Sequence, residues 1–183
     1  MKSIASIING ILDIETGKYT NDPVDSGGET KWGWTKKALR AMGYSGAVED
    51  LTREEAFDLY YTRFVVRSGY REVLNVSDDI GAELVDTAVN MGEQQAGVFL
   101  QKCLNAFNNG GAHYPDIAED GIVGRNTLKA LEKFLRHRGV EGERVMLTAM
   151  NCLQAARYID LCIKYPKNER FVYGWIRTRV SII

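Results

Sequence analysis

Acidic residues gather in one irregular segment near the start of the chain. The stretch ETGKYTNDPVDSGGETKWGWT, residues 15–35, holds four carboxylates and a hydroxyl that could act with them: Glu15, Asp22, Asp25, Glu29 and Thr30. Two carboxyl groups across a groove are the standard arrangement for cleaving a glycosidic bond, because one protonates the leaving oxygen while the other activates water or stabilises positive charge. The segment therefore permits glycosidase chemistry.

Glu15 is the candidate proton donor. The residues before it recur at helical spacing with an apolar face: Ile4, Ile7, Ile8, Ile11 and Leu12. Ser3 is the expected N-cap of this helix. A carboxyl group at the helix C-terminus meets the negative end of the helix dipole, and partial burial against apolar neighbours would add to the effect. Both influences would raise the pKa of Glu15, as a general acid requires; the alternative is an ordinary solvated glutamate.

The second carboxylate and the substrate contacts have more than one candidate. Asp25 is the first choice, with the Thr30 hydroxyl holding a water molecule, and Asp22 competes with it. Both aspartates also fit turns, since Asp22 precedes a proline and Asp25 precedes Ser-Gly-Gly. Trp32 and Trp34 could line a sugar groove, although alternating tryptophans also occur as one core and one surface residue.

The remainder of the sequence predicts a mainly α protein with a small β-hairpin or loop lobe after the first helix. TREE at residues 52–55 is a capping box, Thr35 and Ser77 are further N-caps, and Gly43 ends a helix. Strand signal is confined to residues 17–34. We expect further helices at residues 78–91 and 96–107, from the end of the EDGIVGRN turn to about residue 138, and at residues 141–164 and 168–180.

Charge is divided unevenly along the chain. The whole sequence has a formal net charge of −1, but residues 1–124 carry −8 and residues 125–183 carry +7. A basic second half could attract an anionic cell-wall polymer, or it could be a set of solvated helix faces. No stacking motif or zinc-finger spacing accompanies it, so nucleic acid is not expected. No metal or other cofactor is expected either, since His113 and His137 are isolated in the sequence.

The opening segment resembles the N-terminal signature of the glycoside hydrolase family 108 muramidases, approximately E-G-G-Y-x-N-D-P-x-D-x-G-G-x-T-x-x-G-I-T. That family includes bacteriophage endolysins and bacterial proteins once called secretion activators. The matching residues occur here in the same order: Glu15, Gly17, Tyr19, Asn21, Asp22, Pro23, Asp25, Gly27, Gly28, Thr30, Gly33 and Thr35. Thr16 stands where the family usually has glycine, and Trp34 where it has a small aliphatic residue.

The likeness extends along the chain. LTREEAFDLYYTRF is similar to the family's next helix, ELVDTAVNMGEQQAGVFLQKCLN with EDGIVGRNTLKAL is similar to its predicted peptidoglycan-binding region, and RFVYGWIRTRV resembles its closing F-x-x-G-W-x-x-R element. The resemblance implies a catalytic lobe at residues 1–90 and a helical C-terminal region at residues 91–183, packed as one compact unit. Whether the Asp120–Gly121 turn binds cell wall or only packs stays open.

The resemblance implies a lysozyme-like helical fold that hydrolyses the β-1,4 bond between N-acetylmuramic acid and N-acetylglucosamine. Glu15 corresponds to the catalytic glutamate, with Asp25 and Thr30 near the other two members of a Glu–Asp–Thr set. Tyr19 and Asp22 are expected to contact substrate, together with the two tryptophans. A lytic transglycosylase and a non-catalytic wall-binding or secretion-accessory protein are the alternatives, and inversion versus retention stays open.

Cellular context follows from the same resemblance. The start of the sequence lacks a signal-peptide cleavage site and a membrane span. We therefore expect a monomer, without membrane anchoring, that stays in the host cytoplasm until a holin releases it to the periplasm and cell wall.

Overall fold

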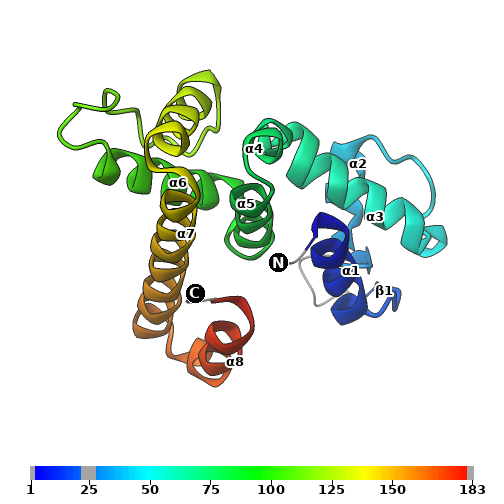
Figure 1. Ribbon diagram of the computed structural model, residues 1–183. Helices are drawn as coiled ribbons and strands as arrows, with labels where there is room; N and C mark the ends of the chain where they lie inside the picture. The colour runs from blue at the N-terminus through cyan, green and yellow to red at the C-terminus, as the bar shows by residue number, and fades with distance from the viewer. Residues whose placement is uncertain (1–2, 22–27, 181–183) are drawn as a thin grey trace. The chain divides into compact units, whose positions relative to one another are not determined.

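A computed structural model gives the structure of the protein, and it describes residues 3–21 and 28–180. The described chain is mainly helical, as the sequence predicts (Figure 1). Its α-helices are α1 (Ile4–Glu15), α2 (Lys36–Met42), α3 (Arg53–Tyr61), α4 (Tyr70–Val76), α5 (Asp78–Met91), α6 (Glu93–Phe107), α7 (Arg125–Lys164) and α8 (Glu169–Arg179). Short 3-10 turns η1 (Val48–Asp50) and η3 (Pro166–Asn168) and the π-helical turn η2 (Thr62–Arg67) connect them.

The predicted helix starts are confirmed by their capping hydrogen bonds. The side chains of Ser3, Thr35 and Ser77 each accept a hydrogen bond from the backbone N–H three residues later. Thr52 and Glu55 form the reciprocal capping box at the start of α3, in which the Glu55 carboxylate accepts from the Thr52 N–H at 2.8 Å. These caps fix where the helices begin, because they satisfy backbone donors that the helix itself leaves unpaired.

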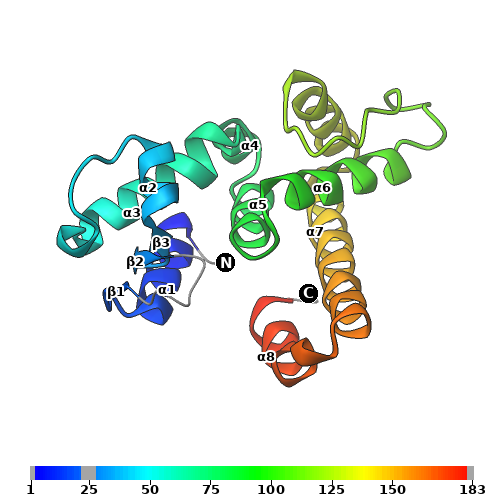
Figure 2. The same ribbon diagram turned by 180° about the vertical axis from the view of Figure 1, so that it is seen from behind.

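The predicted β lobe is a three-stranded antiparallel sheet with the order β1 (Thr20–Asn21), β2 (Glu29–Lys31), β3 (Trp34–Thr35). Thr30 is its central residue, since it pairs with Thr20 on one side and with Thr35 on the other. The strands lie beside α1, as Figure 2 shows. A sheet this small has little stability of its own, so its geometry depends on the helices packed against it.

The contacts divide the chain into two compact units, Met1–Arg67 and Ser68–Ile183. In the first unit α1 packs against α3, and Arg53 joins them through 2.7 Å contacts to Asn9 and Asp13. The functional division expected at residue 90 is a separate question and stays a prediction.

The second unit is built around α5, which contacts α4, α6 and α7. Its core-facing side chains include Ile80 and Leu84, both fully buried. The α7 helix carries non-helical backbone at Gly139, where φ is +61°, so the two helices expected on either side of this glycine meet there. Within the described residues, no helix is both long and apolar enough to cross a membrane.

Candidate active site

Glu15 is the last residue of α1, and the chain turns sharply after it. Thr16 is the C-cap in the left-handed conformation, with φ +55° and ψ +1°, and its N–H donates to the Leu12 carbonyl at 3.2 Å. Glycine is the usual residue at such a cap because it has no Cβ to strain. The expected partial burial of Glu15 is not found, since the structure leaves its side chain exposed. The cause is its place at the helix end, beyond the apolar stripe.

The turn between β2 and β3 lies directly against Glu15. Its two central residues, Trp32 and Gly33, both have positive φ, +52° and +74°, as a type I′ hairpin turn requires. A Cβ on Gly33 would stand 3.0 Å from the Glu15 carboxyl carbon and 2.6 Å from the Tyr60 hydroxyl oxygen. The hairpin backbone therefore approaches the carboxyl group as closely as it can, and only glycine fits there.

Tyr60 is the third member of this cluster, and its only signal in the sequence is its place in an apolar stripe typical of a core helix. It is buried on α3, and its hydroxyl donates to the Trp32 carbonyl oxygen at 3.2 Å. Burial, and after it the nearby negative charge of Glu15, raise the pKa of Tyr60 to about 12. The phenol stays neutral and acts as a fixed dipole next to the Glu15 carboxyl group.

Trp32 holds the hairpin turn in place. Its indole Nε1 donates to the Leu51 carbonyl oxygen at 3.1 Å. Its ring covers Gly17 so tightly that a Cβ there would lie 2.3 Å from a ring carbon. These two contacts offset the strain of a positive φ at a bulky residue. Trp32 as a whole residue is half-buried.

Trp34 differs from the expectation that it lines a groove. It is 2% exposed and packs against Tyr60 with ring centroids 5.0 Å apart. A ring buried this deeply belongs to the core and offers no face to a sugar. Its position on β3, with the side chain turned to the helices, is the reason, and the alternation in the sequence could not distinguish the inward residue from the outward one.

The other expected site residues are placed only in part. Thr30 is half-buried on β2, and its hydroxyl donates to the Gly28 carbonyl oxygen at 3.2 Å. Tyr19 is half-buried just before β1. Asp22 and Asp25 lie outside the described residues, so both remain predictions. The structure thus brings together Glu15, the β2–β3 turn and Tyr60.

Comparison with known proteins adds the family to this geometry. Residues 8–92 match the family model described as Glycosyl hydrolase 108, and residues 95–180 match the one described as Predicted Peptidoglycan domain. Residues 8–92 thus form a glycoside hydrolase family 108 domain. Its fold is similar to a solved structure described as the structure of Brucella abortus SagA, with a TM-score of 0.61 and 20% identity over 96% of this chain and 92% of that one. No curated protein sequence matches the chain.

The two matches together make the protein a lysozyme-like peptidoglycan hydrolase with an attached peptidoglycan-binding domain. The catalytic match includes Glu15, the hairpin and Tyr60, so the cluster described above lies wholly inside the hydrolase domain. It also extends beyond the first compact unit and ends within the second, where α5 finishes.

The family 108 enzyme carries one close pair of imidazoles. His113 and His137, expected to be isolated, lie with their ring centroids 3.8 Å apart and their ring planes tilted by 34°. The two histidines are not isolated because the loop after α6 folds back onto α7, and their separation in the sequence gives no indication of this contact. Among the residues that the structure describes, no group of three or more His, Cys, Asp or Glu side chains could hold a metal ion.

The Asp120–Gly121 turn in the peptidoglycan-binding domain is occupied by internal contacts. The Gly121 N–H donates to Gln101 Oε1 at 2.7 Å, and Gln101 Nε2 donates to Asp120 Oδ1 at 2.9 Å. Hydrogen bonds from Ile122 N–H and then Gln101 hold the pKa of Asp120 below its usual value. The Gly121 carbonyl oxygen would lie 2.1 Å from a Cβ on Gly97. This turn packs on α6, so its residue pattern has a structural explanation.

Proposed function

We propose that the family 108 enzyme is an N-acetylmuramidase that hydrolyses the β-1,4 bond between N-acetylmuramic acid and N-acetylglucosamine, with Glu15 as the general acid. The observation that supports this is the fixed position of the Glu15 carboxyl group. It stands at the end of α1, against the backbone of Gly33 and beside the neutral phenol of Tyr60. Its side chain is exposed, so a glycan strand can reach it.

The proton donor works only if Glu15 holds its proton when substrate is present. A glycan strand laid over the exposed carboxyl group would exclude water from it, and loss of water favours the neutral form. In this proposal substrate binding itself favours the protonated form of Glu15, because the carboxyl group loses its solvent only when a sugar covers it.

The second catalytic group is proposed to be Asp25, with Asp22 as its rival and Thr30 as the holder of water. Thr30 is the central residue of the sheet, and its hydroxyl can accept a hydrogen bond from water while it donates to Gly28. A separation of about 5–5.5 Å between the two carboxyl groups would give retention, and about 6.5–9.5 Å would give inversion. Replacing Asp25 and Asp22 separately with asparagine identifies the group.

The proposal is tested with Glu15→Gln on purified peptidoglycan. General acid catalysis contributes about 10²–10⁴-fold, so the variant should clear the suspension slower by that factor. Asp13→Asn is the matched control, because Asp13 is an acidic residue on the same helix with its side chain 71% exposed and paired with Arg53. Clearance by Glu15→Gln at the wild-type rate would remove Glu15 from the mechanism.

Mass spectrometry of the released fragments separates hydrolysis from its nearest alternative. A hydrolase adds water and leaves reducing N-acetylmuramic acid ends. A lytic transglycosylase would keep Glu15 but would release 1,6-anhydro ends and would not need Asp25. Anhydro products from the wild-type protein would therefore show that the enzyme is a lytic transglycosylase, in which Glu15 would still be the proton donor.

We further propose, from the likeness to endolysins, that the enzyme acts as a monomer that waits in the host cytoplasm for release through a holin lesion. Expression in bacterial cells should then cause lysis only when a holin is co-expressed. Lysis without holin would contradict this route. Sedimentation equilibrium of the purified protein tests the monomer.

A further inference from the structure

A pocket in the second unit has the composition of a sugar-binding site. It measures about 320 Å³, within the range of small-molecule sites. Residues at the end of α5 and on α6, α7 and α8 line it, among them Asn90, Met91, Gln95, Arg157, Tyr158 and Trp175. An indole and a phenol ring, two amides and a guanidinium thus converge on one hollow.

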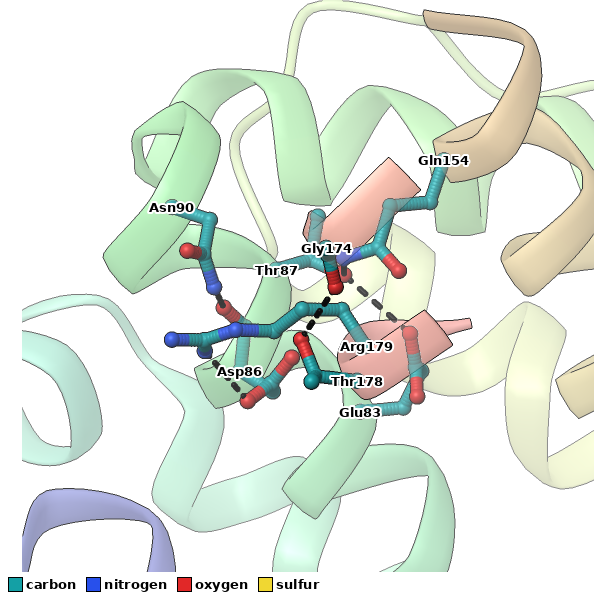
Figure 3. A network of polar contacts seen from close by, with 8 residues as sticks. All are labelled: Glu83, Asp86, Thr87, Asn90, Gln154, Gly174, Thr178 and Arg179. Carbon is teal, nitrogen blue, oxygen red and sulfur yellow. Dashed lines mark hydrogen bonds and ion pairs between the residues drawn. The ribbon is translucent and has the colours of Figure 1, made fainter. Parts of the chain in front are cut away.

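Trp175 is held in this pocket by two neighbouring aromatic rings. Its ring packs against Tyr158 with centroids 5.2 Å apart and against Phe171 with centroids 5.9 Å apart. One turn further along α8, Arg179 pairs with Asp86 of α5 at 2.9 Å. Figure 3 shows this pair, together with the bond of Asn90 to the Asp86 carbonyl oxygen. Asp86 therefore holds both α8, which carries Trp175, and the side chain of Asn90 in place beside the pocket.

Several polar groups around the pocket have no partner within the described part of the chain. Tyr158 is 4% exposed, yet its hydroxyl makes no hydrogen bond there. Buried polar groups are nearly always hydrogen-bonded, so an unpaired hydroxyl beside a pocket indicates a missing partner. The side chains of Gln95 and Arg157 also lack polar contacts with other described residues. The pocket offers donors that a ligand could use.

We infer that this pocket binds an N-acetylated amino sugar of the peptidoglycan strand without cleaving it. The Trp175 ring would pack against the C–H face of the pyranose, since aromatic faces attract weakly positive C–H groups. Gln95 and Tyr158 would bond its hydroxyl and acetamido groups. Arg157, in the half of the chain with net charge +7, would face the carboxylates of the wall peptides. The inference rests on the proposed function only in that its ligand is the same polymer.

The test uses the Glu15→Gln protein, so that the probe is not cut, and titrates it with tri-N-acetylchitotriose. The three tryptophans give three indole N–H signals in an NMR spectrum, and Trp175→Phe identifies the signal of Trp175. We expect that signal to shift on titration. Gln95→Ala and the isosteric Tyr158→Phe should each weaken the binding that it reports about fivefold, the value of one lost hydrogen bond. Tyr173→Ala, an aromatic on the same helix that is 76% exposed and outside the pocket, should bind as the parent does.

The outcomes separate this inference from the proposed function. If only the signals of Trp32 or Trp34 move, the sugar binds in the hydrolase domain alone and the pocket is excluded. Equal affinity of the Gln95, Tyr158 and parent proteins would also exclude it. If the Trp175 signal moves but wild-type protein releases no fragments from peptidoglycan, the pocket stands and the muramidase proposal fails.

Discussion

The Glu15 carboxyl group packs directly on Gly33, so that a Cβ added to this glycine would lie 3.0 Å from the Glu15 carboxyl carbon. The two residues come from different elements, the end of α1 and the β2–β3 turn. The contact means that the hairpin backbone, more than any side chain of the sheet, sets where the candidate proton donor stands.

Gly33→Ala should therefore disable the enzyme. The new methyl group would push against Glu15 and the Tyr60 hydroxyl, and a displacement of about 1 Å in a reacting group can cost roughly a hundredfold in rate. Peptidoglycan clearance measures the effect. Gly43→Ala is the matched control, because Gly43 also has positive φ, +90°, but has open space around its Cβ position. If the two variants lose activity equally, backbone strain explains the loss and the contact does not.

Thr16→Gly should stabilise the protein. Thr16 occupies the left-handed C-cap of α1, which costs a residue with a Cβ about 1 kcal/mol relative to glycine. We expect the free energy of unfolding to rise by about that amount in urea titrations. Lys18→Gly serves as the control, since Lys18 is exposed and has no positive φ, so glycine there should be neutral or destabilising. A loss of stability in Thr16→Gly would contradict the cap geometry.

Tyr60→Phe should destabilise the protein by about 1 kcal/mol at pH 8, because it removes the hydrogen bond to the Trp32 carbonyl oxygen. The folded state raises the pKa of Tyr60 from 10.0 to about 12, so it favours the neutral phenol. That stabilisation is complete below pH 10 and is lost as the pH rises from 10 to 12. The difference between wild type and Tyr60→Phe should narrow over this range in urea unfolding. If the difference in free energy of unfolding widened instead, the folded state would not favour the neutral phenol of Tyr60.

Arg179→Met should lower the free energy of unfolding by about 3–5 kcal/mol, because it leaves the Asp86 carboxylate, 11% exposed, without its ion-pair partner. Thermal denaturation monitored by circular dichroism reports the change. Arg177→Met is the control, since Arg177 is exposed on the same helix and its guanidinium lies over the exposed Tyr173 ring, 5.9 Å from the ring centroid. Equal effects of the two substitutions would show that the pair with Asp86 contributes little.

The sequence by itself determined the helix starts and the place of the small sheet. Ser3, Thr35, Thr52 and Ser77 each cap a helix through a bond to a residue three positions away. Such contacts are local, so the types and spacing of neighbouring residues specify them before any tertiary structure forms. The acidic segment after α1 and the family that it resembles could also be predicted, because both depend on the order of residues in one continuous segment.

Only the tertiary structure decided what surrounds Glu15 and what fills the second unit. The sequence does not distinguish Trp32 from Trp34, yet the Trp32 ring covers Gly17 while the Trp34 ring is buried against Tyr60. The phenol of Tyr60 reaches the hairpin from α3, and Arg179 reaches Asp86 across 93 positions. Contacts between residues so far apart depend on how the elements pack, and the local pattern of a sequence carries no record of that packing.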